Sequence, residues 1–133
     1  MSSTTKLLFD THAFLAFFNR EEGSETIKNL MDTIQNGDAE GFVAAITLTE
    51  LAYVYSRKSD AATARLRVMQ VQGSKLQLIP LSAKIAVEAG LMKRPGITVA
   101  DTIIAASALS AGASVVTNDS HFAEKGIGVR GYP

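Results

Sequence analysis

The chain has 133 residues, of which 47% are hydrophobic and 20% are charged, and it contains no cysteine. Such a chain can bury a core of its own, which excludes a disordered protein, and the lack of cysteine excludes both a disulfide framework and a thiolate metal site. Thirteen basic and thirteen acidic residues give a formal net charge of zero. Any binding to nucleic acid must therefore rely on local basic patches.

The first residues lead directly into a short apolar run, instead of the long apolar segment of a signal peptide. The longest weakly polar stretch, Thr102–Val116, is shorter than the roughly 20 apolar residues that span a bilayer, and serines interrupt it. We therefore expect a soluble, cytoplasmic protein without a membrane partner.

The chain begins with the apolar run Lys6–Asp10, which predicts a strand that is buried on both faces and ends in an acid. A short apolar helix is expected over Ala13–Asn19. The next segment, Ser24–Gln35, has apolar residues at helical spacing, and we expect Ser24 to cap its start.

The middle of the chain alternates in the same way. Gly41–Ile46 predicts a second buried strand, and two consecutive helices are expected over Thr47–Ser59 and Ala61–Gln72. Leu76–Leu81 alternates apolar and polar residues and contains a proline, which is typical of an edge strand.

The last third contains the most apolar helix of the chain. A helix over Ser82–Met92 leads to the turn Arg94–Gly96, and a second helix over Thr98–Ala111 ends at Gly112. The remaining predicted elements are a strand at 113–117, a single helical turn at 120–125 and a short strand at 127–130. Strands that alternate with helices indicate βαβ units and a mainly parallel sheet.

Four acidic residues stand at the ends of predicted elements. Asp10 closes the first strand and Asp119 follows the fourth, whereas Glu50 and Asp101 are expected in the first turns of their helices. The carboxyl ends of parallel strands, and the helix starts that follow them, meet at one edge of a sheet. We therefore expect the four carboxylates to meet on one side.

Each acid, taken singly, also has an interpretation without catalysis. The pair Thr47 and Glu50 fits a capping box, and Thr98 with Asp101 repeats the pattern. Asp10 and Asp119 can each cap the helix that follows. These alternatives remain open for each residue.

The joint occurrence of the four acids favours a metal site. Asp10 and Asp101 lie among apolar residues, where unpaired charge is strongly unfavourable, and neighbouring acids raise each other's pKa values. A divalent cation relieves both effects. Oxygen ligands without cysteine suit Mg²⁺ or Mn²⁺, and such an ion supports phosphodiester hydrolysis.

Weaker candidates lie beside the same acids. His12 and His121 each follow an acid by two positions, and the preferred interpretation of both is an ordinary histidine at a helix start. Thr11, Thr117 and Asn118 can hydrogen-bond a carboxylate or a phosphate. The most basic segment contains Arg57, Lys58, Arg65, Arg67 and Lys75. For this segment a solvated helix face is slightly favoured over a track for a phosphate backbone.

With these acids placed, the chain resembles the PIN-domain ribonucleases, and among them the small VapC-type toxins of prokaryotic toxin–antitoxin pairs. The resemblance extends from Lys6 to about Val129. It is carried by the segments LLFDT at 7–11, ITLTEL at 46–51, VADTIIAA at 99–106 and VTNDSHF at 116–122.

The resemblance implies a three-layer α/β/α sandwich, PIN-like, with a central mainly parallel sheet of four to five strands and a single domain over residues 1–133. It also implies a homodimer, Mg²⁺- or Mn²⁺-dependent cleavage of RNA, and a VapB-type antitoxin whose tail occupies the groove leading to the site. Asp10, Glu50 and Asp101 match the metal-holding acids and Asp119 the more variable fourth. Thr117 matches the hydroxyl just upstream of Asp119, and Asn118 departs from the pattern, because relatives often carry arginine there.

Three alternatives have different chemistry. A phosphatase with an aspartyl nucleophile fits Asp10, but such enzymes generally have a second acid two residues on, where this chain has His12. A receiver domain expects its aspartate at the end of a middle strand, and the second strand here ends without an acid. A PIN-like module that binds RNA or protein without cleaving ranks low, because all four acids are present.

Overall fold

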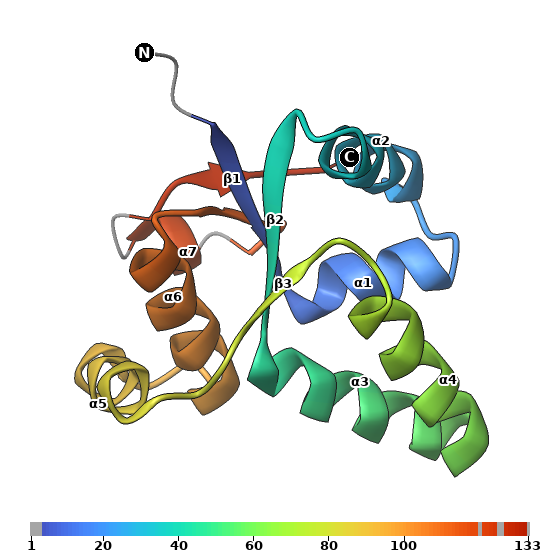
Figure 1. The fold of residues 1–133 in the computed structure, drawn as a ribbon. Coiled ribbons are helices and arrows are strands. Elements are labelled where there is room, and N and C mark those ends of the chain that lie inside the picture. Colours follow the sequence, from blue (N-terminus) through green and yellow to red (C-terminus); the bar gives the residue numbers. More distant parts are fainter. Residues whose placement is uncertain (1–3, 120, 125–126, 133) are drawn as a thin grey trace.

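A computed structural model describes residues 4–119, 121–124 and 127–132 (Figure 1). Its strands form a single five-stranded sheet of order β3-β2-β1-β4-β5 in which every neighbouring pair is parallel. The strands are β1 (Thr5–Phe9), β2 (Ala39–Ala44), β3 (Gln77–Ile79), β4 (Ser114–Val116) and β5 (Val129–Arg130). The mainly parallel sheet predicted from the alternating pattern is confirmed.

Helices cover both faces of this sheet (Figure 1). One face packs against α1 (Thr11–Phe18), α2 (Ser24–Gln35), α3 (Ala45–Lys58) and α4 (Ala61–Gln72). The other face packs against α5 (Ala83–Met92), α6 (Val99–Ala111) and α7 (His121–Glu124). The result is the three-layer α/β/α arrangement expected from the resemblance. No helix in the described ranges is both long enough and apolar enough to cross a bilayer.

The central strand β1 shows why its sequence is apolar without interruption. Successive side chains of a strand point to opposite faces of the sheet. Leu7 and Phe9 accordingly belong to the core on the α1–α4 side, and Leu8 belongs to the core on the other side. All three are almost completely buried, so β1 holds Asp10, which follows it directly, at a fixed position.

Two predicted side-chain caps, Ser24 and Thr47, are wrong, and α1 begins at Thr11, two residues before the predicted Ala13. Helix α2 does begin at Ser24, but its cap is Gly23 in a left-handed conformation with φ of 90°, and no side chain caps it. Helix α3 begins at Ala45, two residues earlier than expected, and again lacks a side-chain cap. Thr47 is therefore inside the helix, and Glu50 lies in its second turn. The capping-box interpretation of Glu50 is thereby excluded.

Other predicted ends are confirmed. The side chain of Thr98 accepts a hydrogen bond from the amide of Asp101 at 3.1 Å, and Gly112 ends α6 with φ of 66°, a left-handed conformation that glycine adopts without strain. Strand β3 lies at the sheet edge, as predicted, but it is shorter than expected, and Pro80 follows its last residue instead of lying inside it. Of the turn predicted at 120–125, residues 121–124 form α7, and 120 and 125 lie outside the described residues.

Candidate active site

The carboxyl edge of the sheet opens into a cleft of about 480 Å³. Asp10 lies in it at the end of β1, and Thr117, Asn118 and Asp119 follow β4 on the neighbouring strand. The last described residue, Tyr132, lines the same cleft. The parallel topology thus brings together residues from the two ends of the chain.

Asp10 is the most buried acid of the site, with 3% of its surface exposed. One carboxylate oxygen accepts the amide of Ala13 at 2.8 Å and so caps α1, and the other accepts the hydroxyl of Thr117. Burial raises the pKa of Asp10, and the nearby negative charge of Asp101 raises it further. The two hydrogen bonds and the imidazole of His12 act in the opposite direction. The net effect is a carboxylate whose charge is only partly compensated by the protein.

Glu50 is held by a chain of hydroxyl groups. The hydroxyl of Thr11 lies 2.6 Å from Oε1 of Glu50 and 3.2 Å from the hydroxyl of Thr47, which is fully buried. Since the Thr11 hydroxyl carries one hydrogen and a carboxylate is the stronger acceptor, Thr11 donates to Glu50. Thr47, which the sequence suggested as a helix cap, instead supports this contact from inside α3.

Asp119 lines the cleft with Asp10 and contacts the start of the helix that follows it. Its Oδ1 accepts the backbone amide of His121 at 2.9 Å and lies 2.8 Å from the imidazole Nδ1 of the same residue. Its backbone amide donates to the hydroxyl of Thr117 at 3.0 Å. The capping role considered for Asp119 is therefore present, and Thr117 connects Asp119 to Asp10.

The four acids thus lie at one edge of the sheet but do not form one compact cluster. Within the ranges that the structure describes, no three Asp, Glu or His side chains stand close enough to hold a metal ion as they are placed. Asp10, Glu50 and Asp119 each accept hydrogen bonds from protein donors. The negative charge of Asp101 also acts on Asp10 and raises its pKa. The oxygen ligands and the buried charge of Asp10 fit a divalent cation.

The sequence was also compared with known protein families. The family model described as "PIN domain" matches residues 7–128. The chain belongs to the PIN-domain family. A comparison with curated proteins gives no match.

Solved structures show the same PIN fold. A chain of VapBC2 from Rickettsia felis bound to a DNA fragment from its promoter matches with a TM-score of 0.77 and 20% identity, over 97% of this chain and 100% of that chain. DNA-bound VapBC from Salmonella typhimurium matches with a TM-score of 0.72 and 24% identity, over 98% and 100%. VapC20 of Mycobacterium tuberculosis, a toxin that cleaves the sarcin–ricin loop, matches with a TM-score of 0.71 and 14% identity, over 91% and 95%.

Tyr132, like Glu21 and Glu22, lines the cleft of this PIN domain but was not predicted from the sequence. Its amide donates to Oδ1 of Asn118 at 2.8 Å. Burial, and then the negative charges of Asp10 and Glu21, raise the pKa of the phenol to about 12. The phenol therefore keeps its proton throughout the neutral range. The strand predicted at 127–130 could have indicated this position. A parallel strand beside β4 ends at the same edge of the sheet, so the residues that follow it, including Tyr132, lie near the cleft.

The basic residues of the PIN domain do not form one continuous track. Lys58, in the last turn of α3, lines the cleft with Asp10. The guanidinium of Arg67 instead stacks on Phe18, 4.7 Å from the ring centre, and donates to Gln70 at 3.0 Å. Arg65 lines a separate hollow between α3 and α4. Of the basic residues named here, Lys58 is the one that lines the cleft with Asp10.

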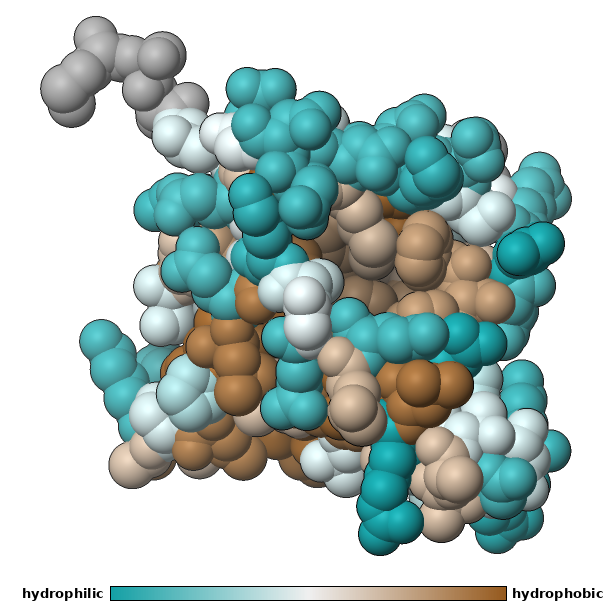
Figure 2. All heavy atoms as spheres, turned by 45° about the vertical axis from the view of Figure 1, so that its right-hand side comes forward, coloured by the Kyte–Doolittle hydropathy of each residue, from teal (hydrophilic) through white to brown (hydrophobic). Residues whose placement is uncertain are grey.

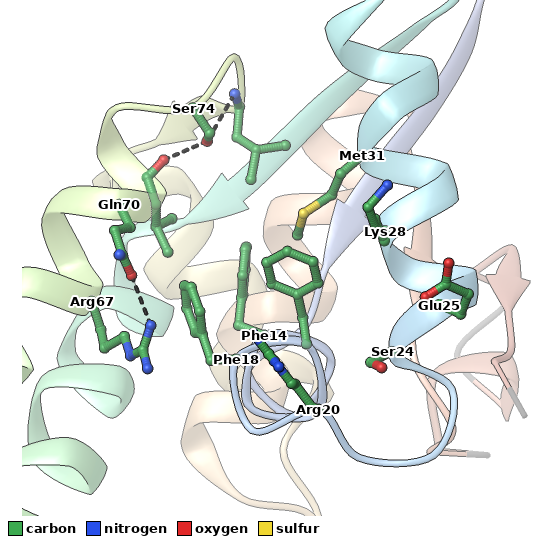
Figure 3. Close-up of a pocket in the computed structure, with 13 residues that line it drawn as sticks. Phe14, Phe18, Arg20, Ser24, Glu25, Lys28, Met31, Arg67, Gln70 and Ser74 are labelled. Carbon is green, nitrogen blue, oxygen red and sulfur yellow. Dashed lines mark hydrogen bonds between the residues drawn. The ribbon is translucent and has the colours of Figure 1, made fainter.

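A second and larger cavity of the PIN domain, about 760 Å³, lies between α2 and α4. Figure 2 shows hydrophobic side chains gathered in a hollow with hydrophilic residues around it. In Figure 3, Phe14 and Phe18 point from α1 into the space between Met31 of α2 and Arg67 of α4. We call this cavity the α2–α4 groove.

Proposed function

We propose that this PIN domain is a divalent-metal-dependent endoribonuclease and the toxin of a type II toxin–antitoxin pair of the VapC type. The observation that carries the proposal is the buried carboxylate of Asp10, which lies beside the charge of Asp101 in the cleft of a PIN fold. A burial of this kind is strongly unfavourable without a compensating cation.

Asp10 and Asp101 are the residues that would hold the ion, and Glu50 and Asp119 would join them by leaving their present donors, Thr11 and His121. Mg²⁺ or Mn²⁺, once bound, supplies an activated water and neutralises charge on the phosphodiester. Thr117 acts through Asp10, because its hydroxyl fixes the orientation of that carboxylate. Lys58 adds a positive charge at the mouth of the cleft, where the RNA backbone would enter.

The proposed partner is a VapB-type antitoxin, and its proposed seat is the α2–α4 groove. Two of the similar structures are VapBC complexes. The floor of the groove is aromatic, and Arg20 and Arg67 lie on its lining. The buried Nε of Arg67 has no hydrogen-bond partner within the described residues. The apolar side of an amphipathic segment would cover the aromatic floor, and a carboxylate on that segment would pair with the guanidinium groups on the lining.

We also propose a homodimer located in the cytoplasm. Helix α5 exposes 61% of Val87 and 77% of Leu91, and α6 begins with Val99 at 61% exposure. A second copy that covers these neighbouring apolar side chains would remove them from water. Size-exclusion chromatography with light scattering measures the mass directly, and a monomer at micromolar concentration would contradict this part of the proposal.

The test of the nuclease assignment is cleavage of RNA by purified protein with and without Mg²⁺ or Mn²⁺. The wild type is expected to cleave only with metal, and Asp10→Asn is expected to be inactive while keeping its fold. Equal activity of both proteins would point to a contaminating nuclease. A folded wild type that binds RNA but never cuts it would favour the alternative of a silent PIN-like binding module.

A further inference from the structure

Beyond the four acids, the tail that follows β5 enters the cleft. Strand β5 pairs in parallel with β4, with Val116 opposite Arg130, and the amide of Thr117 donates to the carbonyl of Arg130 at 3.0 Å. Beyond the paired strands, the side-chain oxygen of Asn118 accepts a hydrogen bond from the backbone amide of Tyr132. Tyr132 is thus fixed beside Asp10 by backbone and side-chain contacts.

The phenol of Tyr132 is largely enclosed, with 9% of the residue exposed. Its ring therefore offers no open face on which a base could stack. In the described part of the chain its hydroxyl makes no hydrogen bond, and the one fully buried side-chain polar atom without a partner is Nε of Arg67. Tyr132 lines the cleft that holds Asp10, and its hydroxyl is the group of this side chain that can donate a hydrogen bond to a ligand there.

The cleft around this position carries several carboxylates together with Lys58. Asp10 and Glu21 both act on Tyr132 electrostatically, and Glu22 lines the same cleft. A phosphodiester in such surroundings needs hydrogen-bond donors close to its oxygens, and a neutral hydroxyl supplies one without competing for the cation.

We propose that Tyr132 is a substrate-binding residue whose hydroxyl donates a hydrogen bond to a non-bridging oxygen of the RNA phosphodiester bound beside Asp10. Asn118 is its positioning residue, because Asn118 holds the backbone of Tyr132 at the cleft. The inference rests on the proposed nuclease function, since it takes single-stranded RNA as the ligand.

The experiment measures the affinity for a labelled single-stranded RNA in a full-length Asp10→Asn background with Mg²⁺, in which the proposed function predicts no cleavage. Adding Tyr132→Phe should weaken binding about tenfold or more, as expected for the loss of a hydrogen bond to a charged oxygen. Adding Asn118→Ala should weaken it in the same direction. The matched control is Tyr53→Phe, because Tyr53 is 62% exposed and lies outside the cleft.

The outcomes separate the two proposals. An unchanged affinity with Tyr132→Phe overturns the inference even if the wild type cleaves RNA. A weakened affinity, with the control unchanged and thermal unfolding of all variants alike, supports it. Failure of the wild type to cleave RNA with any divalent metal, while the binding difference persists, defeats the nuclease assignment and leaves the contact of Tyr132 with RNA standing.

Discussion

The hydroxyl of Thr117 donates a hydrogen bond to Oδ2 of Asp10, although the two residues stand 107 positions apart in the sequence. They follow adjacent parallel strands, β4 and β1, and both are buried. The same hydroxyl accepts the amide of Asp119 at 3.0 Å. One small side chain therefore determines how the first and last acids of the site stand toward each other.

Replacement of Thr117 by valine should damage both stability and activity. Valine has nearly the same shape but leaves the buried carboxylate of Asp10 and the amide of Asp119 without this partner. We expect the free energy of unfolding to fall by about 1–3 kcal/mol and RNA cleavage to drop at least tenfold, as measured by urea denaturation and by initial rates.

The matched variant is Thr117→Ser, which keeps the hydroxyl and removes only a methyl group. It should retain most of the activity of the wild type. If valine and serine at this position behaved alike, the hydrogen bond to Asp10 would have no role in orienting the carboxylate.

Metal binding should stabilise the wild type through Asp10 and Asp101. A ligand at a hundred times its dissociation constant adds about 2.7 kcal/mol to the folded state, which corresponds to a rise of several degrees in Tm for a chain of this size. Asp10→Asn combined with Asp101→Asn should remove most of the shift produced by Mg²⁺ or Mn²⁺ in differential scanning fluorimetry.

The control for this measurement is Asp60→Asn. Asp60 caps α4 at a fully exposed position outside the cleft, so its substitution should leave the metal-induced shift intact. A shift that survives in the double variant would place the ion elsewhere on the protein.

The stability of the metal-free protein should depend on pH through Asp10. Burial raises the pKa of Asp10 above its ordinary value of 3.8, so the folded chain holds this proton more tightly than the unfolded chain. The contribution of Asp10 therefore favours folding at low pH and is lost as the pH rises from 3.8 through the raised pKa. Asp10→Asn should gain stability relative to the wild type across this window, as measured by urea denaturation in EDTA. A difference that shrinks with rising pH would mean that the pKa of Asp10 is lowered.

The α2–α4 groove should be separable from catalysis. Met31 lines the groove. The variant Met31→Glu should bind the cognate antitoxin at least tenfold more weakly, because a buried carboxylate would replace an apolar contact. RNA cleavage by the free toxin should remain. Met69→Glu is the matched control, because Met69 is 65% exposed and lines a different hollow. Loss of activity in Met31→Glu together with retained antitoxin binding would contradict the assignment of the groove.

The layout of the sheet could be predicted from the sequence because its strands are continuous apolar runs. A buried run such as Leu7–Phe9 is specified by burial on both faces, and the residue that follows it must then lie at the carboxyl edge. The position of Asp10 could therefore be predicted from the local sequence alone. For Asp10 and Thr117, the sequence predicted that both lie at the same edge of the sheet, but not that they form a hydrogen bond.

Details that depend on distant contacts could not be predicted. Thr47 matched a capping pattern, but α3 begins at Ala45 without any side-chain cap, and the hydroxyl of Thr47 meets Thr11 of another helix. Tyr132 carries no motif of its own. Its place in the cleft depends on β5 pairing with β4 and on a single bond to Asn118, and both partners lie 14 positions earlier in the sequence.

The distance in sequence between Asp10 and Thr117 also determines when the site can assemble while the ribosome makes the chain. Strand β1 emerges early and pairs with β2, but its other edge waits for β4, which is made after six of the helices. Until then Asp10 has neither Thr117 nor Asp119 beside it. If the proposed function holds, a nascent chain would lack the complete nuclease site for most of its synthesis, and the site would form only when nearly the whole domain is available to the proposed antitoxin.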